Sequence, residues 1–205
     1  MMKLYIVRHA ESEGNATGNY STAIADSLSA SGRKEAEALA DSLTAWAFDT
    51  IIVSPRLRAL QTIAPYLVAT GQQAEIWPEI AEACWHEERE EPAGTWPRQA
   101  ASLPAFAPGH FCFRDGEPIA PADVESFGEG LCRIHTALHL IQEAFIPDQE
   151  SVLVVTHGHV IREILNLMLA TRELDPFHHE NCGLTCLSYK GCWTLEFCNR
   201  KIIGH

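Results

Sequence analysis

Three short apolar segments stand out along the chain because their polar and apolar positions do not alternate. They are Leu4–Val7, Ile51–Val53 and Val152–Val155, and most of their residues are β-branched. Strands that are buried on both faces of a parallel sheet have this pattern, whereas strands with one wet face alternate. The pattern therefore predicts three central strands of a largely parallel sheet.

A helical pattern follows each of these predicted strands, with apolar residues recurring every three or four positions. These residues are Ala36, Leu39, Ala40, Leu43 and Ala47 after the first strand, Leu60, Ile63, Ala64, Leu67 and Val68 after the second, and Ile161, Ile164, Leu165, Met168 and Leu169 after the third. We expect Ser54 to be the N-cap of the second helix, with Pro55 as its first helical residue, and Gly71 to end it.

The rest of the chain adds one further helix, two strands and an irregular segment. Apolar residues from Phe127 to Phe145 predict the helix, and Gly183–Tyr189 and Trp193–Phe197 predict two strands joined by a short turn. Most prolines lie between residues 77 and 121, so we expect an inserted, partly irregular segment at about 84–122. Alternating strands and helices predict an α/β fold, a three-layer α/β/α arrangement with a mostly parallel central sheet.

The composition of the chain indicates its domain size and excludes some classes of binding partner. The 205 residues suit a single domain over 1–205, and the 46 % of hydrophobic residues supply a substantial core. The net charge of -12 argues against nucleic acid and anionic membranes as partners. No apolar run is long enough to predict a membrane span. The seven cysteines include no CxxC pair, which favours reduced thiols and a cytoplasmic protein, and the sequence indicates no oligomeric state.

Basic residues follow all three central strands. Arg8 and His9 follow the first, Arg56 and Arg58 follow the second, and the segment 156–159, Thr-His-Gly-His, follows the third. In open α/β sheets, ligands bind beyond the carboxyl ends of the strands, where helix N-termini also favour anions. Any one of these residues alone could be an ordinary surface residue, but their convergence predicts a site for a compact dianion such as phosphate.

These residue types suit phosphoryl transfer. Arginine forks hold phosphate oxygens bidentately, and a neutral histidine is a competent nucleophile. Attack by His9 on phosphorus would form a phosphohistidine that water then hydrolyses. A second histidine could stabilise the charge on the phosphoryl oxygens, and a carboxylic acid with a raised pKa could protonate the leaving group.

The segments at the strand ends resemble the motifs of one family, the histidine phosphatase superfamily, also called phosphoglycerate mutase-like. Residues 8–15, RHAESEGN, resemble its RHG-type signature, 54–62, SPRLRALQT, resemble its SPLxRAxQT segment, and 156–162, THGHVIR, resemble its second histidine motif. Residues 28–32, the segment from Glu125 to Arg133, and Asn181 fit further elements of the family. The resemblance covers nearly the whole chain outside 84–122.

The resemblance implies a role for each matching residue. His9 would be the phosphoaccepting nucleophile, and the residues that bind the phosphoryl group would be Arg8, Arg58 and His157, with help from Asn15. Glu82 would be the general acid, because the family places an acidic residue shortly after its third strand. We also expect Gly158, His159 and Asn181 to contact phosphate or substrate. The family implies no metal and no other cofactor.

Several alternatives remain open at this point. Glu79 and the cluster Glu87, Glu88, Glu90 and Glu91 compete with Glu82 as the acid, although the cluster reads more simply as a solvated loop. Ala10 replaces the family's usual glycine, and His159 stands where a small or polar residue is commoner. The missing substrate-binding pattern of the glycolytic mutases favours a phosphatase acting on a small phosphorylated metabolite. A mutase and a non-catalytic phosphate-binding module are the alternatives.

Two further sets of residues carry weaker hypotheses. A metal site is a minority interpretation of His157 and His159, and of the segment 178–182 with Cys186, because arginines nearby oppose a cation and buried cysteine is common. Six residues of the inserted segment are candidates for a substrate pocket, although most of its aromatic residues are expected to form a small core: Trp85, His86, Trp96, Arg98, Phe111 and Arg114. The substrate itself is not predicted.

Overall fold

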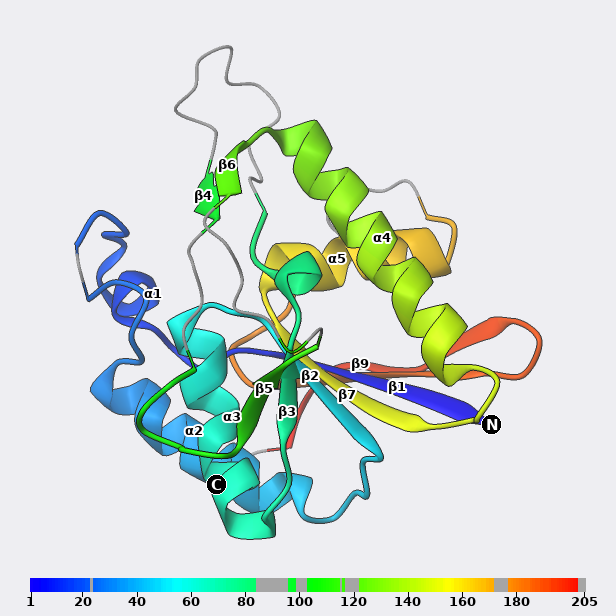
Figure 1. Cartoon of the computed structure of the whole chain (residues 1–205), viewed down its shortest axis with the longest axis horizontal. Helices are drawn as coiled ribbons and strands as arrows, with labels where there is room; N and C mark the ends of the chain where they lie inside the picture. Colours follow the sequence, from blue (N-terminus) through cyan, green and yellow to red (C-terminus); the bar gives the residue numbers. More distant parts are fainter. Residues whose placement is uncertain are drawn as a thin grey trace.

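The computed structural model describes residues 1–22, 24–83, 96–98, 103–114, 116, 122–171 and 177–202 (Figure 1). The strands are β1 (Met2–Arg8), β2 (Thr50–Val53), β3 (Ala74–Ile76), β4 (Trp96–Arg98), β5 (Phe111–Phe113), β6 (Ala122–Glu125), β7 (Ser151–Thr156), β8 (Gly183–Tyr189) and β9 (Trp193–Lys201). The helices are α1 (Glu13–Thr17), α2 (Ala30–Leu43), α3 (Leu57–Thr70), α4 (Phe127–Phe145), α5 (Gly158–Met168) and the short 3-10 helix η1 (Pro78–Ile80).

Seven strands form the central sheet in the order β5-β3-β2-β7-β1-β8-β9. The strands from β5 to β1 run parallel to one another, and β8 and β9 add an antiparallel edge. Helices α2 and α3 cover one face of the sheet, and α4 and α5 cover the other (Figure 1). The predicted α/β/α arrangement with a mostly parallel sheet is therefore confirmed.

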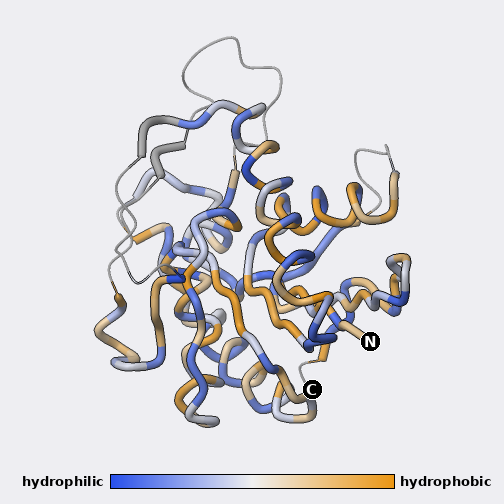
Figure 2. Tube along the Cα trace, turned by 45° about the vertical axis from the view of Figure 1, so that its right-hand side comes forward, coloured by the Kyte–Doolittle hydropathy of each residue, from blue (hydrophilic) through white to orange (hydrophobic). Residues whose placement is uncertain are grey.

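The central strands lack alternation because both of their faces are buried. Along β1, Tyr5 and Val7 pack into the core beneath α2 and α3, whereas Leu4 and Ile6 pack into the core beneath α4 and α5. Figure 2 shows these apolar strands between the more mixed surfaces of the helices. Because both faces of β1 are buried, the strand lies inside the molecule, and Arg8 and His9 follow at its carboxyl end.

Three details of the predicted helices are wrong. Helix α3 begins at Leu57 with Arg56 as its N-cap, and the Ser54 hydroxyl, which accepts from the N–H of Arg56, lies 2.7 Å from Nε2 of His157. Helix α2 ends at Leu43, and after the following turn Phe48 enters the core while Ala47 is exposed. Val68 is 57 % exposed because it lies at the solvent edge of its helix face. Gly71 ends α3 as expected, with a φ of 71°.

The inserted segment contributes more regular structure than its composition indicates. Strand β5 pairs in parallel with β3 at the edge of the main sheet, and β4 pairs with β6 in a separate two-stranded sheet. None of the helices in the described ranges is long and apolar enough to cross a membrane. That residues 1–205 form a single domain stays a prediction.

Candidate active site

His9 leaves the carboxyl end of β1 with its backbone fixed on both sides. Its N–H donates to the carbonyl oxygen of Thr156 on β7 at 2.9 Å, and its own carbonyl accepts from Nδ2 of Asn181 at 2.8 Å. The N–H of Cys182 also donates to the carbonyl of Arg8 at 3.0 Å. Two neighbouring segments therefore hold His9 where the sheet ends, and only 2 % of the residue is exposed.

The hydrogen bonds of the His9 ring select one neutral tautomer. Nδ1 lies 2.7 Å from the Ala10 carbonyl oxygen, which can only accept, so Nδ1 carries the proton. Nε2 accepts from Nε–H of Arg58 at 3.0 Å and therefore holds the lone pair. Burial, together with the nearby Arg58 and Arg8 guanidiniums, lowers the pKa of His9 well below its usual value. The geometry thus favours a neutral imidazole whose basic nitrogen, Nε2, faces Arg58.

Arg58 lies in the first turn of α3 and contacts three groups of the site. Beyond its bond to His9, its Nη1 forms an ion pair with Asp26, and its Nη2 lies 3.9 Å from Oε2 of Glu82. Asp26 also accepts from the N–H of Leu57, so one carboxylate fixes both the start of α3 and the Arg58 side chain. Sequence reasoning missed Asp26, which lies in a loop with no recognisable pattern.

His157 follows β7, and Ser54 fixes the direction of its ring. Ser54 Oγ accepts from the N–H of Arg56 and lies 2.7 Å from Nε2 of His157. The hydroxyl hydrogen is therefore available to donate to Nε2, which leaves the ring proton on Nδ1. Nδ1 has no hydrogen-bond partner among the described residues. Burial, Arg58 and His9 lower the pKa of His157 well below its usual value, and its ring centroid lies 5.1 Å from that of His9.

Glu82 follows η1, and its carboxyl group lies beside His157 and Arg58. Oε2 lies 3.8 Å from Nδ1 of His157, and Oε1 has no hydrogen-bond partner within the described ranges. Burial raises the pKa of Glu82, although Arg58 and His159 oppose this shift. The raised pKa favours the protonated form of this carboxyl, which lies next to the neutral imidazole of His157.

Glu79, the competing carboxylate that the structure describes, does not share this position. Oε1 of Glu79 pairs with Nη2 of Arg114 at 3.0 Å, and the guanidinium of Arg114 lies over the ring of Trp77. The cluster Glu87, Glu88, Glu90 and Glu91 lies outside the described residues. Among the carboxylates that the structure describes, Glu82 is the one within 4 Å of both Arg58 and His157.

Arg8 reaches the same cluster from the end of β1. Its Nη1 donates to the carbonyl oxygen of His179 at 2.6 Å, while its buried Nε has no partner in the part of the chain that the structure describes. Gly158 at the start of α5 lies against this side chain, since a Cβ added there would lie 3.6 Å from Arg8 Nε. Arg8, Glu82 and His157 thus each bring an unpaired polar atom to this cluster of side chains.

The remaining predicted binding residues have mainly structural contacts here. The Asn15 side chain closes the capping box of α1 with Ser12 and donates to the Tyr20 hydroxyl at 3.1 Å. Asn181 holds the His9 backbone, as described above. His159 stacks on Phe127 with ring centroids 6.1 Å apart, and its Nε2 lies 3.5 Å from Oε1 of Glu163.

The structure describes only some of the residues on which the weaker hypotheses rest. Across the described residues, no group of three or more His, Cys, Asp or Glu side chains is arranged to hold a metal ion. Phe111 is buried in the main core, and Arg114 pairs with Glu79. Trp85 and His86, and the side chains of Trp96 and Arg98, lie outside the described part of the structure.

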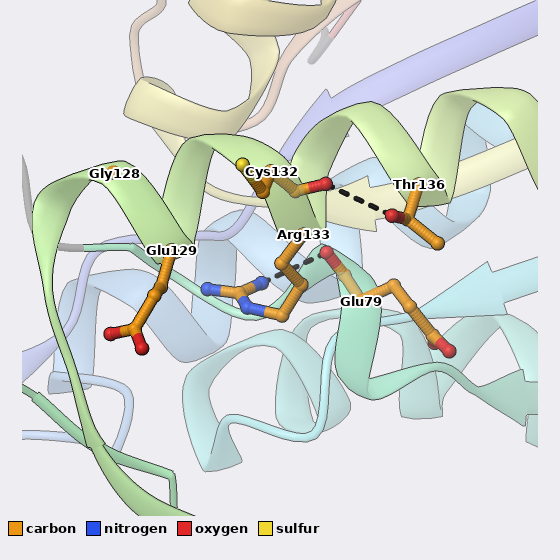
Figure 3. Close-up of a pocket in the computed structure, with 6 residues that line it drawn as sticks. All are labelled: Glu79, Gly128, Glu129, Cys132, Arg133 and Thr136. Carbon is orange, nitrogen blue, oxygen red and sulfur yellow. Dashed lines mark hydrogen bonds between the residues drawn. The ribbon is translucent and has the colours of Figure 1, made fainter.

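A separate pocket of about 570 Å³ lies beside α4 (Figure 3). Its lining consists of Glu79, Gly128, Glu129, Cys132, Arg133 and Thr136. None of the predicted catalytic residues lines it, so the chemistry at the strand ends lies elsewhere. Glu79 and Arg133 connect this pocket to the site at the strand ends. Glu79 belongs to η1, which immediately precedes the segment that carries Glu82, and Arg133 donates to the carbonyl of Glu79.

Comparisons with known proteins agree with this arrangement. The model of a family described as "Histidine phosphatase superfamily (branch 1)" matches residues 4–200. An adenosylcobalamin/alpha-ribazole phosphatase of Salmonella typhi is 25 % identical over 199 residues, which cover 96 % of this chain and 91 % of that protein. Phosphoserine phosphatase 1 of Hydrogenobacter thermophilus is 44 % identical over 62 residues, 30 % of this chain and 29 % of that protein.

A solved structure has the same fold over the whole chain. The alpha-ribazole phosphatase from Shigella flexneri superposes with a TM-score of 0.70 at 19 % identity, and the match covers 100 % of this chain and 99 % of the other. The predicted family resemblance is therefore confirmed, and the relatives that match are named as phosphatases.

Proposed function

The chain belongs to the histidine phosphatase superfamily, and on this basis we propose that it is a phosphomonoesterase that works through a phosphohistidine on His9. The observation that carries the proposal is the state of the His9 ring. Its Nδ1 proton is held by Ala10, and its Nε2 lone pair meets only Arg58 among the described residues. A nitrogen nucleophile is thus oriented next to a cation that can bind the incoming phosphoryl group.

Binding would begin with exchange of hydrogen bonds. A phosphate dianion is a better partner for Arg58 than a neutral imidazole, so its oxygens would take over the Nε–H that now covers His9 Nε2. The unpaired Nε–H of Arg8 and the Nδ1–H of His157 would supply two further donors. These charged and polar donors balance the negative charge of the transferring group.

The first chemical step would then transfer the phosphoryl group to the protein. The lone pair of His9 Nε2 forms a bond to phosphorus while the bond from phosphorus to the ester oxygen breaks. The proton of the Glu82 carboxyl passes to that oxygen, so an alcohol leaves and a carboxylate remains. The phosphorylated ring carries positive charge, which the Ala10 carbonyl stabilises through the Nδ1–H bond.

The second step would release phosphate and restore the starting state. Water attacks phosphorus and gives a proton to the Glu82 carboxylate, while the bond from phosphorus to Nε2 breaks and its electron pair returns to the ring. Apart from substrate and water, both steps use only groups of this protein: the His9, Glu82, Arg8, Arg58 and His157 side chains and the backbone carbonyl of Ala10. The Salmonella and Hydrogenobacter relatives are named for alpha-ribazole and phosphoserine. We propose a small phosphorylated metabolite as the substrate here too, and a cytoplasmic location.

The test compares three proteins in the presence of a metal chelator. Wild type, His9→Ala and the control His139→Ala, which removes an exposed histidine from α4, are mixed with 4-nitrophenyl phosphate and phosphate release is measured. Wild type and His139→Ala should turn over alike, and His9→Ala should lose on the order of 10³-fold or more. Rapid quenching into alkali should capture a phosphoryl group on wild type and none on His9→Ala.

Three results would contradict the proposal. Activity that survives in His9→Ala would remove the nucleophile from its role, and activity lost to the chelator would require a metal. Transfer of a phosphoryl group between positions of one substrate, without free phosphate, would make the protein a mutase.

A further inference from the structure

Arg133 is a buried cation on α4 that no step above uses. Only 7 % of its side chain is exposed, and its Nε and Nη2 donate to the two carboxylate oxygens of Glu125 at 2.6 and 2.7 Å. Glu125 is the last residue of β6, and 2 % of its side chain is exposed. This bidentate pair fixes the plane of the guanidinium and leaves its remaining N–H bonds to point elsewhere.

The remaining N–H bonds point to the segment that carries Glu82. Nη1 of Arg133 donates to backbone carbonyl oxygens, at 2.8 Å to Glu79 and at 2.9 Å to Ala81. Longer contacts of 3.4 Å reach the carbonyls of Pro78 and of Glu82 itself. Figure 3 shows the guanidinium of Arg133 extending from α4 to the carbonyl of Glu79.

This segment has left the sheet; Ile80 and Ala83 are buried in the core, but its own backbone bonds are those of the single turn of η1. Strand β3 ends at Ile76, and η1 supplies only one turn before Glu82. The carbonyl that Arg133 does not reach, that of Ile80, accepts from the hydroxyl of Thr156, the residue before His157, at 2.7 Å. Two side chains, Arg133 and Thr156, therefore bind every carbonyl from residue 79 to residue 82.

We propose that Arg133, held by Glu125, is the positioning residue that sets the place of the Glu82 carboxyl relative to His9 and His157. The inference rests on the function proposed above and adds a residue to it. A general acid works only when its proton lies within reach of the leaving oxygen, so a loose segment would cost proton transfer more than it costs substrate binding. A lysine cannot replace the arginine, because one ammonium cannot match a planar fork with five donors.

Leaving groups of different quality distinguish positioning from mere folding. Phenyl phosphate and 4-nitrophenyl phosphate have the same ring, but phenolate is the poorer leaving group and depends more on the acid. Glu82→Gln should therefore reduce kcat/KM for phenyl phosphate by on the order of 10²-fold or more and reduce it far less for 4-nitrophenyl phosphate. This ratio of the two effects is the signature of a lost acid.

Arg133→Lys should show the same signature in weaker form. We expect a loss of roughly tenfold or more on phenyl phosphate and of less than about threefold on 4-nitrophenyl phosphate. The double variant Glu82→Gln with Arg133→Lys should have the same ratio as Glu82→Gln alone, because Arg133 acts through Glu82. Thr136→Ala is the matched control, since Thr136 lines the same pocket beside α4 and its hydroxyl donates to the carbonyl of Cys132.

A second pair of variants guards against failure to fold. Glu125→Gln combined with Arg133→Gln removes both buried charges together and should give the same leaving-group signature as Arg133→Lys. An equal loss on both substrates in either folded variant would overturn the inference and leave Arg133 a purely structural residue. If His9→Ala stays active, or Glu82→Gln shows no leaving-group dependence, the proposed function fails instead.

Discussion

The two sides of the proposed active site are held by different kinds of bond. On the nucleophile side, β1 pairs along its length with β7 on one edge and with β8 on the other. Backbone bonds continue past the strand end, from His9 to Thr156 and from Cys182 to Arg8. The position of His9 therefore follows from the pairing of the sheet.

On the acid side, the sheet has already ended. Glu82 lies six residues beyond the end of β3, and the carbonyls around it are bound by side chains from α4 and β7. One of these side chains is a charged group in a buried pair, which is fixed only as long as its partner is present. Beyond the burial of Ile80 and Ala83, placement of the acid therefore depends on hydrogen bonds from two side chains, whereas placement of the nucleophile depends on the backbone bonds of a sheet.

The largest effect that we expect from this contrast is on the stability of the protein. Arg133→Met removes the guanidinium that binds both carboxylate oxygens of the buried Glu125, so the free energy of unfolding should fall by roughly 3–5 kcal/mol. The matched control is Arg162→Met, whose guanidinium is 26 % exposed beside Glu163 and should cost less than about 1 kcal/mol. Urea denaturation followed by circular dichroism measures both. If both variants lost the same free energy of unfolding, the Arg133–Glu125 pair would contribute no more to stability than the more exposed Arg162–Glu163 pair.

The second test uses pH to separate the two sides. Burial and Arg58 hold the pKa of His9 well below its usual value, so the nucleophile stays neutral as the pH falls through the range where most histidines protonate. Burial raises the pKa of Glu82, against Arg58, His159 and Arg8, so the acid keeps its proton above the range where most carboxyls ionise.

These directions predict the shape of the pH profile. The kcat/KM for phenyl phosphate should fall as the pH rises through the raised pKa of Glu82, approaching about tenfold per pH unit. In Glu82→Gln this fall at high pH should disappear, because the amide has no proton to lose in that range. The same fall in the variant would assign it to another group and remove Glu82 from the acid role.

The smallest expected effect comes from the nucleophile side. Asn181→Ala removes the amide that donates to the His9 carbonyl, but the pairing of β1 remains. We expect a loss of about 1 kcal/mol in the free energy of unfolding and a change of only a few-fold in kcat. Asn199→Ala, which removes an acceptor for the N–H of Glu180 farther from His9, is the control. A loss of activity as large as that of Arg133→Lys would abolish the contrast between the two sides.

The sequence predicts the nucleophile side better than the acid side, and for the same structural reason. Buried parallel strands have a composition that is visible locally, and the edge at which they end follows from the fold class. Arg8, His9, Arg58 and His157 could therefore be assigned to one edge of the sheet before any coordinates, and the structure brings them together.

The supporting contacts could not be read from the sequence in this way. Ser54 has the position of an N-cap, but its hydroxyl serves His157, about a hundred residues away in sequence. Asp26 lies in a loop, and Arg133, although it ends a segment that resembles a family element, has no sequence feature that indicates its contact with the Glu82 segment. Each of these contacts joins residues far apart in the chain, and a local pattern has no information about such partners.

The bond from Arg58 to His9 has a consequence for the idle protein. The same N–H that we expect to bind the phosphoryl group now covers the lone pair of the nucleophile. An uncharged electrophile cannot compete for the N–H of Arg58, so the bond that covers His9 Nε2 would remain. A dianion would accept that N–H and so free Nε2 as it binds. Under the proposed mechanism, the ligand that the site recognises would therefore also free the nitrogen with which it reacts, and other electrophiles would meet a nitrogen covered by Arg58.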